Sequence, residues 1–165
     1  MKEIRTERLV LRPLTIADAD DVFEWTSDPV VNRYMPYPLH ENVHQTKEWI
    51  RTLSSNEFCF CLKESGKVIG SGSINYKEKY GAYELGYNLN RLFWGKGYAT
   101  EASKAMIQWA YQNLNAREFL ACHANANKSS ENVIKKCGFQ FEQYGLLAKY
   151  DGSVTFEASY YRLHL

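Results

Sequence analysis

Two glycines, Gly95 and Gly97, mark the segment of this chain whose residue types most clearly suggest chemistry. They lie within Trp94–Thr100, between an alternating, strand-like run and the clearest amphipathic helix pattern in the sequence. The N-terminus of a helix presents unpaired N–H groups and a partial positive charge, and glycines let the backbone curl tightly around an anion. The segment therefore predicts a phosphate cradle, although a plain strand-to-helix turn would use the same two glycines.

The spacing within this turn excludes the two common nucleotide-binding loops. In a P-loop, Gly-Lys is followed by Ser or Thr, whereas here Lys96 is followed by Gly97. A dinucleotide-binding fingerprint needs a third glycine at the position that Thr100 occupies. A phosphate-binding regulator that takes simple nucleotides is therefore disfavoured.

Hydrophobic periodicity predicts the elements that hold the turn in place. Alternation and turn residues predict strands at 9–13, 58–62, 68–76, 82–89 and 119–123, and two more that start at 139 and 154. Helices are predicted from Thr15, over 41–53, from Tyr98 to Ala110 and from Asn127 to Gly138. This order of elements predicts one α/β (α+β) domain around a mixed sheet, spanning residues 1–165.

Charge and composition exclude several classes of function. The 20 basic and 19 acidic residues give a net charge of +1, so no basic excess points to nucleic acid or to an anionic membrane. The first residues are charged, and no apolar run approaches the roughly 20 residues of a membrane span. We therefore expect a cytoplasmic protein, monomeric or homodimeric, without a nucleic-acid or membrane partner.

Cys59, Cys61, Cys122 and His123 are the residues from which a zinc site could be assembled. Cys59 and Cys61 share one face of a predicted strand, because strand side chains alternate. The sequence lacks the paired Cys-x-x-Cys spacing of zinc knuckles, and buried thiols are common in protein cores. We therefore expect reduced, structural cysteines and no bound metal.

Several linked motifs show a resemblance to a known family. The chain contains Thr6–Arg12 (TERLVLR), Leu85–Tyr87 (LGY), Trp94–Ala102 (WGKGYATEA), and Asn127-x-x-Ser130 followed by Lys136–Phe139 (KCGF). In these motifs and their order it resembles the GCN5-related N-acetyltransferases (GNAT), within them the branch that includes ribosomal-protein N-terminal acetyltransferases. The resemblance covers nearly the whole length. It implies a mixed, mostly antiparallel sheet of about seven strands, flanked by helices, with a splayed cofactor cleft.

By this resemblance the cofactor is acetyl-CoA, and its pyrophosphate would be held by the backbone amides that follow Trp94, those of Gly95, Lys96, Gly97, Tyr98, Ala99 and Thr100. The family's usual loop, Gln/Arg-x-x-Gly-x-Gly/Ala, is matched here except at its first position, where this chain has Trp94. The strand edge at Tyr87 and Leu89 would pair with the pantetheine arm. A split in the sheet beside Leu89 would admit the thioester, and Asn127 would contact the cofactor.

Acetyl transfer to an amine needs a neutral nucleophile and a proton for the departing thiolate. We predict Glu84, on the strand that leads to the glycine turn, as the general base acting through water. A surface carboxylate that faces Lys77 across a hairpin is the competing interpretation. His123 is an alternative base, although its place on a short inner strand favours a core histidine. Some family members use a hydroxyl near the Ser130 position as the acid, and others a tyrosine four residues later, where this chain has Ile134. Ser130 is therefore the predicted acid.

The predicted acceptor is a primary amine, on a protein N-terminus or a small molecule, which attacks directly in a ternary complex. An N-terminal amine, with a pKa of about 7.7–8.0, needs less help than a lysine-type amine at about 10.4. In the family the acceptor site is covered by the region that here holds Tyr34, Met35 and Tyr37, which we expect to shape the substrate pocket. We assign Glu101 a structural role, because the helix dipole favours an acid in the first turn. A non-catalytic acyl-CoA-binding module is the alternative function.

Overall fold

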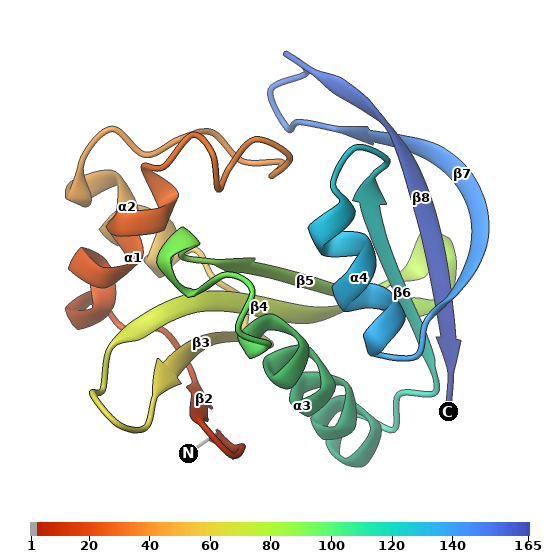
Figure 1. Cartoon of the computed structure of the whole chain (residues 1–165), viewed down its shortest axis with the longest axis horizontal. Coiled ribbons are helices and arrows are strands. Elements are labelled where there is room, and N and C mark those ends of the chain that lie inside the picture. Colours follow the sequence, from red (N-terminus) through yellow and green to blue (C-terminus); the bar gives the residue numbers. More distant parts are fainter. Residues whose placement is uncertain (1–2) are drawn as a thin grey trace.

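An eight-stranded sheet runs through the middle of the molecule, with helices on its two faces (Figure 1). The computed structural model describes residues 3–165. The helices are α1 (Ala19–Thr26), α2 (Val43–Arg51), α3 (Tyr98–Asn113) and α4 (Lys128–Lys136), with short 3-10 turns at Ile16–Asp18, Glu78–Tyr80 and Arg91–Phe93. The strands are β1 (Ile4–Arg5), β2 (Leu9–Arg12), β3 (Glu57–Leu62), β4 (Val68–Lys77), β5 (Ala82–Leu89), β6 (Glu118–Ala124), β7 (Gln140–Ala148) and β8 (Thr155–His164).

The strands lie in the spatial order β1-β2-β3-β4-β5-β6-β8-β7. Neighbours are antiparallel except for β5 and β6, which run parallel and are connected through α3. β4 and β5 pair along the whole of β5, whereas β5 and β6 pair at Tyr83 with Phe119 and at Glu84 with Leu120. The two central strands therefore diverge beyond Glu84, in the direction of the glycine turn.

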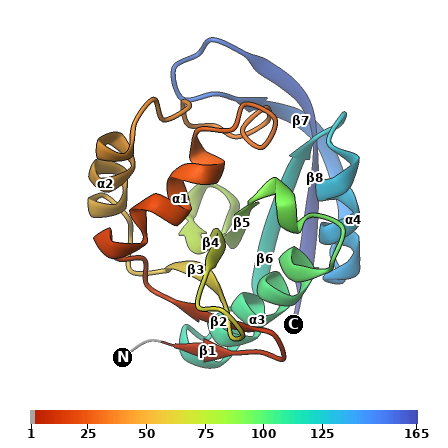
Figure 2. The ribbon, with the colours of Figure 1, turned by 60° about the vertical axis from the view of Figure 1, so that its left-hand side comes forward.

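Two apolar clusters, one on each face of the sheet, hold the helices in place. α3 and α4 pack on one face, where Met106 and Ile134 are almost fully buried. α1 and α2 pack on the opposite face through Trp25 and Ile50. Figure 2 shows α1 and α2 on one side of the strands and α3 and α4 on the other. The divergence of β5 and β6 thus opens between two separate helical layers.

Glycines in β4 allow β5 and α3 to approach closely. A Cβ atom at Gly72 would lie 2.7 Å from the carbonyl oxygen of Gly86 and 2.7 Å from Cε of Met106. A Cβ atom at Gly70 would lie 2.5 Å from the carbonyl oxygen of Asn88. A backbone carbonyl cannot rotate aside as the end of a side chain can, so a side chain at either position would push β5, the strand that carries the glycine turn, away from β4.

The predicted fold class is confirmed, with differences near the N-terminus. The sheet has eight strands, because the two-residue strand β1, too short to leave a periodic pattern, pairs with β2. The helix predicted from Thr15 begins as the 3-10 turn Ile16–Asp18 before α1, and Asp18 accepts from the Thr15 backbone N at 2.8 Å. The next helix is shorter than predicted and spans Val43–Arg51, because Asn42 is its N-cap.

Candidate active site

The predicted phosphate cradle is a strand–turn–helix unit whose two glycines are both left-handed. Gly95 has a φ of 71° and Gly97 a φ of 83°, backbone angles that residues other than glycine rarely adopt. α3, a helix of 16 residues, begins at Tyr98, so that Ala99 and Thr100 lie in its first turn. The turn therefore leads directly into the N-terminus of a long helix, where unpaired N–H groups can bind phosphate oxygens.

Trp94 ties the start of the turn back to β5. Its indole Nε1 donates a hydrogen bond of 2.8 Å to the carbonyl oxygen of Leu89. The backbone N–H of Leu89 donates a hydrogen bond of 3.0 Å to the side-chain oxygen Oδ1 of its neighbour Asn88. Both backbone groups of Leu89 therefore already have partners. Tyr87, two residues earlier, directs its backbone to the same edge, because successive strand residues alternate. Of the two predicted partners of the pantetheine arm, Tyr87 is thus the more accessible.

Arg8, in the segment just before β2, fastens the turn from outside. Its Nη1 donates to the carbonyl oxygen of Lys96 at 2.8 Å, and its guanidinium carbon lies 4.2 Å from the centre of the Tyr98 ring. Its Nη2 is the nearest atom, at 3.4 Å, to the place that a Cβ atom would take on Gly97. The guanidinium therefore both fixes the shape of the turn and brings a positive charge beside it.

Glu101 completes this connection from the first turn of α3. It pairs with Arg8 at 2.7 Å, and its other oxygen accepts from Thr6 Oγ1 at 2.6 Å. Burial opposes the ionisation of Glu101, but the hydrogen bonds from Thr6 and Arg8 outweigh it and hold its pKa below the ordinary value. These contacts agree with the structural role predicted for Glu101. The part played by Arg8 was missed, although it lies in the TERL motif that carries the family resemblance.

Asn127 and Ser130 stand at the N-terminus of α4, across the gap from β5. Asn127 Oδ1 accepts a hydrogen bond of 3.2 Å from the backbone N of Ser130, which confirms the predicted cap. Gly138, with a φ of 94°, follows the helix in the left-handed conformation that was also predicted. α4 is therefore capped at both ends, and its first turn is held at one wall of the gap.

The hydroxyl groups of Tyr87 and Ser130 form a bridge from β5 to α4. Tyr87 Oη lies 2.7 Å from Ser130 Oγ and also donates to the Ser130 carbonyl oxygen at 3.1 Å. Burial raises the pKa of Tyr87, although the hydrogen bond with Ser130 partly offsets the shift. This chain has Ile134 at the position where some family members have a tyrosine as the acid. Tyr87 instead brings a tyrosine hydroxyl to Ser130 from another element, the strand β5. Sequence reasoning assigned Tyr87 a backbone role alone, although strand alternation puts its side chain on the face of α4.

Glu84 lies on the other face of β5 from Tyr87, as strand alternation requires. Its Oε2 is 3.3 Å from Lys77 Nζ, so the ion pair of the competing interpretation is present, and the Glu84 side chain is 32% exposed. Burial, with a contribution from the charge of Glu84, raises the pKa of Cys122 to about 12. Glu84 is therefore close to Cys122 of β6, at the point where the two strands begin to diverge.

The segment between α1 and α2, residues 27–42, covers this same face of β5. Tyr37 Oη accepts a hydrogen bond of 2.5 Å from Nδ2 of Asn88, which shares the face of Glu84 by alternation. The ring of Tyr37 also lies 5.9 Å from that of Trp49 on α2. Tyr37 therefore anchors the covering segment to the strand that carries the predicted base.

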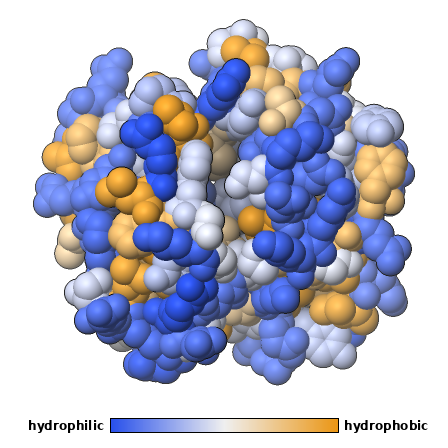
Figure 3. Space-filling view, in the orientation of Figure 1, coloured by the Kyte–Doolittle hydropathy of each residue, from blue (hydrophilic) through white to orange (hydrophobic). Residues whose placement is uncertain are grey.

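The other two predicted pocket residues contact the C-terminal hairpin. Tyr34 packs edge-on against Phe156 of β8, with ring centres 5.3 Å apart. The carbonyl oxygen of Met35 accepts from Lys149 Nζ at 2.9 Å. The surface is hollowed between this covering segment and α4, above β5 (Figure 3). All three predicted residues thus lie in one cover over the gap, but each contacts a different element.

His123 faces the opposite side of the sheet from Glu84, in the core beneath α3 and α4 with Phe119. Its Nδ1 lies 2.7 Å from the carbonyl oxygen of Ala124, and its Nε2 lies 3.3 Å from Tyr161 Oη. The side chain is 3% exposed. With both ring nitrogens partnered, His123 fits the core interpretation and not the alternative of a general base.

The part of the chain that the structure describes, residues 3–165, does not bring the residues of the zinc alternative together as a metal site. Cys59 and Cys61 belong to the cluster beneath α1 and α2, whereas Cys122 lies on β6, and all the cysteines are free. Within residues 3–165, no three His, Cys, Asp or Glu side chains gather as metal ligands would. In the same residues no helix is long and apolar enough to cross a membrane.

A family model described as "Acetyltransferase (GNAT) domain" matches residues 8–140. The chain belongs to this GNAT family of acetyltransferases, as its motifs predicted. Membership makes it an acyltransferase that depends on acetyl-CoA. A Bacillus licheniformis protein with the name "Uncharacterized N-acetyltransferase p20" is 33% identical over 159 residues, which cover 92% of this chain and 88% of the relative.

Solved structures share the fold over nearly the whole chain. A GNAT-family acetyltransferase from Bacillus anthracis has a TM-score of 0.89 at 24% identity, covering 99% of this chain and 98% of that one. The ribosomal-protein-S5-alanine acetyltransferase of Vibrio fischeri has a TM-score of 0.80 at 19% identity, covering 99% and 97%. At these identities the two structures show the fold alone. They confirm the GNAT architecture and include a neighbour from the predicted ribosomal-protein branch.

Proposed function

We propose that this protein transfers the acetyl group of acetyl-CoA to a primary amine, on a protein N-terminus or a small molecule, by direct attack in a ternary complex. The divergence of β5 and β6 beyond Glu84, with the glycine turn at its end, supports the proposal most directly. Tyr87 and Glu84 project to opposite faces of β5. The donor and the acceptor can therefore reach one gap from opposite sides of the sheet.

The residues around the gap fit acetyl-CoA in their chemistry. The left-handed turn at Gly95 and Gly97 leaves room for phosphate oxygens beside the N–H groups of α3, and Arg8 adds a positive charge there. The backbone of Tyr87 offers strand-like pairing to an extended amide chain, and the Asn127 side chain stands at the far wall. When bound, acetyl-CoA supplies a thioester carbonyl that an amine can attack.

Glu84 is the proposed general base. Its partly exposed carboxylate can accept the proton of the attacking amine through a water molecule. The Tyr87 and Ser130 hydroxyls, 2.7 Å apart, are the proposed acid. Tyr87 Oη–H would give its proton to the departing thiolate sulfur, Ser130 Oγ–H would donate a hydrogen bond to the phenolate that is left, and the phenolate would regain a proton from water. Tyr87 is partly buried, and its raised pKa means that it holds its proton at neutral pH until the thiolate forms.

The first experiment is thermal unfolding with acetyl-CoA, and with ATP and NAD as controls. A ligand at about 100 times its Kd adds roughly 2.7 kcal/mol of stability, so a shift with acetyl-CoA alone is expected. An acceptor screen on N-terminal peptides and small amines then measures transfer. Binding without transfer to any amine would favour the acyl-CoA-binding module instead.

Matched variants then separate catalysis from structure. Glu84→Gln and Lys77→Met both remove the ion pair between these residues, but Glu84→Gln alone removes the base. We expect kcat to fall by about 10²-fold in Glu84→Gln and to change little in Lys77→Met. Tyr87→Phe should lower kcat by a similar factor while leaving acetyl-CoA affinity within about threefold. Equal activity in both ion-pair variants would remove Glu84 from the mechanism.

A further inference from the structure

The side-chain amide of Asn88, near the end of β5, has an orientation that its neighbours fix. The residue is 7% exposed. The backbone N–H of Leu89 donates to Asn88 Oδ1 at 3.0 Å, and Asn88 Nδ2 lies 2.5 Å from Tyr37 Oη. A backbone N–H is always a donor, so the atom that faces it must be the amide oxygen. Nδ2 is then the atom that faces Tyr37, and it can only donate.

Asn32, in the covering segment, fixes the second hydrogen of this amide. It is 3% exposed and donates from Nδ2 to the carbonyl oxygens of Trp25 at 2.5 Å and Asp28 at 2.8 Å. Its Oδ1 is therefore an acceptor, and Asn88 Nδ2 donates to it at 3.4 Å. Both hydrogens of the Asn88 amide are thus used, one on Asn32 and one on the tyrosine oxygen.

Tyr37 consequently has a hydroxyl hydrogen that the protein does not use. Its oxygen accepts from Asn88, so the hydrogen must point elsewhere, and among residues 3–165 no other side chain or carbonyl is bonded to this hydroxyl. Tyr37 is partly buried, and burial raises its pKa, so the hydrogen stays in place at neutral pH. Polar groups that are removed from water are normally paired. An unused donor here is therefore suited to a ligand.

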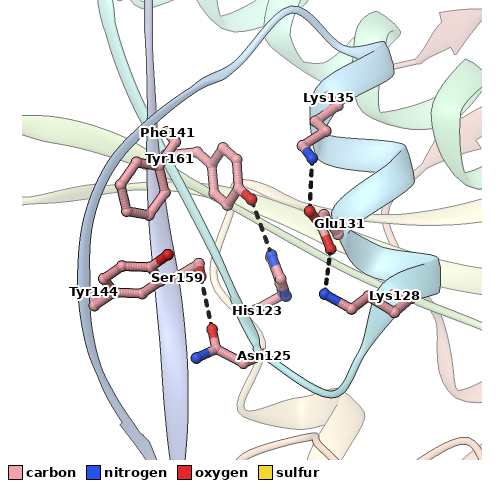
Figure 4. A pocket seen from close by; sticks show the side chains of 9 residues that line it. All are labelled: His123, Asn125, Lys128, Glu131, Lys135, Phe141, Tyr144, Ser159 and Tyr161. Carbon is pink, nitrogen blue, oxygen red and sulfur yellow. Dashed lines mark hydrogen bonds and ion pairs between the residues drawn. The ribbon is translucent and has the colours of Figure 1, made fainter.

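Other tyrosine hydroxyls beside the sheet donate within the protein. Tyr160 Oη donates to a carbonyl oxygen of β7 at 2.7 Å. Tyr161 lines a hollow of about 400 Å³ beside α4, where its Oη lies 3.3 Å from His123 Nε2 (Figure 4). Because His123 Nδ1 faces the Ala124 carbonyl oxygen, it carries the hydrogen of the neutral ring, and Nε2 accepts from Tyr161. Tyr37 differs from both residues by its unused hydrogen.

The Tyr37 hydroxyl lies close to the gap between β5 and β6. Asn90 N donates to the Ile69 carbonyl oxygen of β4 at 2.8 Å, so the amide of Leu89, one residue earlier, faces the other way, toward the gap. Asn88 Oδ1 binds that amide, and Nδ2 of the same side chain binds Tyr37 Oη. The hydroxyl is therefore one carboxamide group away from the edge beside which we expect the thioester of acetyl-CoA to enter.

We propose that Tyr37 is a catalytic residue whose hydroxyl donates a hydrogen bond to the thioester carbonyl oxygen of acetyl-CoA, and that Asn88 is the positioning residue that directs it. This catalytic role rests on the proposed function, because negative charge develops on that oxygen when an amine attacks, and a fixed donor stabilises the charge. The C–N bond forms as the carbonyl π electrons move to the oxygen, and they return as the C–S bond breaks. Tyr37 keeps its proton throughout, since the amine proton passes through water to Glu84 and the sulfur takes its proton from Tyr87.

Infrared difference spectra of bound acetyl-CoA, with and without ¹³C at the thioester carbonyl, test this hydrogen bond without any amine. A donor weakens the carbonyl bond, so its stretching frequency should be lower on the wild type than on Tyr37→Phe. Tyr76→Phe is the matched control, because Tyr76 is 54% exposed and lies on the other face of the sheet, with its ring 5.2 Å from that of Tyr83. It should leave the frequency unchanged. Equal frequencies on the wild type and Tyr37→Phe would overturn the proposal, whichever acceptor the protein uses.

Asn88→Asp reverses the bond to Tyr37 with almost no change in shape. An ionised carboxylate only accepts, so it should draw the Tyr37 hydrogen away from the gap and raise the carbonyl frequency to that of Tyr37→Phe. Thermal unfolding shows whether each variant is folded. A folded Asn88→Asp with the frequency of the wild type would contradict the positioning role.

Kinetics with an amine from the acceptor screen then separate catalysis from binding. Tyr37→Phe and Asn88→Asp should each lower kcat by about 10²-fold while the acceptor KM stays within about threefold. The double variant should lose no more than either single one, because both changes remove the same hydrogen bond. A raised acceptor KM at an unchanged kcat would overturn the proposal, since Tyr37 would then bind the amine. That result would leave the proposed function intact.

Discussion

Replacing Arg8 by glutamine removes the side chain that fastens the glycine turn to the N-terminal segment. The variant loses the 2.8 Å hydrogen bond to the carbonyl of Lys96 and the 2.7 Å ion pair with Glu101. Since both contacts shape the turn proposed to hold pyrophosphate, the variant should bind acetyl-CoA more weakly. Acetyl-pantetheine carries the same thioester without the pyrophosphate, and its affinity should stay unchanged.

The size of the effect follows from these contacts. A hydrogen bond that involves a charged group contributes about 1.5–3 kcal/mol. The Arg8 side chain is 39% exposed, so solvent reduces that value. We therefore expect Arg8→Gln to lose about 1.4 kcal/mol of acetyl-CoA binding, which is a tenfold rise in Kd. Arg8→Lys keeps the charge but loses the forked geometry of the guanidinium. Its Kd for acetyl-CoA should therefore lie between those of the wild type and Arg8→Gln.

Isothermal titration calorimetry with both ligands measures this difference. Arg5→Gln is the matched control, because Arg5 is a nearby arginine whose side chain is 68% exposed and pairs with Glu3. Urea unfolding reports any general loss of stability. Equal weakening of acetyl-CoA and acetyl-pantetheine would refute the reasoning, because it would mean that Arg8 supports the fold and not the turn. An unchanged affinity for acetyl-CoA would refute it as well.

Three further predictions concern stability. Gly72→Ala should lower the free energy of unfolding by about 1–3 kcal/mol, because its Cβ atom would meet the carbonyl of Gly86; an unchanged urea midpoint would contradict this. Asn127→Ala should cost about 1 kcal/mol by removing the cap on Ser130 N, and Asn127→Asp should restore most of it. The pKa of Glu101 is lowered in the folded state. The ionised carboxylate therefore contributes fully to the free energy of unfolding above its unfolded pKa of about 4.3, and this contribution is lost as the pH falls through its folded pKa. The stability difference between the wild type and Glu101→Gln should therefore shrink from about pH 6 to about pH 3, and a constant difference would count against the ion pair.

Local patterns were enough to predict most elements of the fold. α3 was predictable because its buried residues Ala102, Met106 and Ala110 recur at steps of four. The position of β8 between β6 and β7 was not, since it rests on pairs such as Ala121 with Tyr161, which no local pattern encodes. The mostly antiparallel sheet with its splayed cleft was expected only through the family resemblance, and the spatial order of its strands was not predicted.

The candidate site divides in the same way. The glycine turn and the cap at Asn127 are local, and the structure has both as predicted. The bridge between Tyr87 and Ser130 joins residues 43 positions apart. The bond from Arg8 to Lys96 spans 88 positions. Contacts of this kind depend on how the sheet brings distant strands together, so residue types and spacing alone could not reveal them.

The cover over the Glu84 face is secured by residues from the far end of the chain. Lys149 Nζ donates to the Met35 carbonyl, 114 positions earlier, and the N–H of Tyr150 donates to Pro36 at 2.8 Å. The contacts of the glycine turn, in contrast, are all available once residue 101 has been made. During synthesis the donor side of the gap can therefore take shape before the acceptor side. We expect the choice of amine to be the last property that the growing chain acquires.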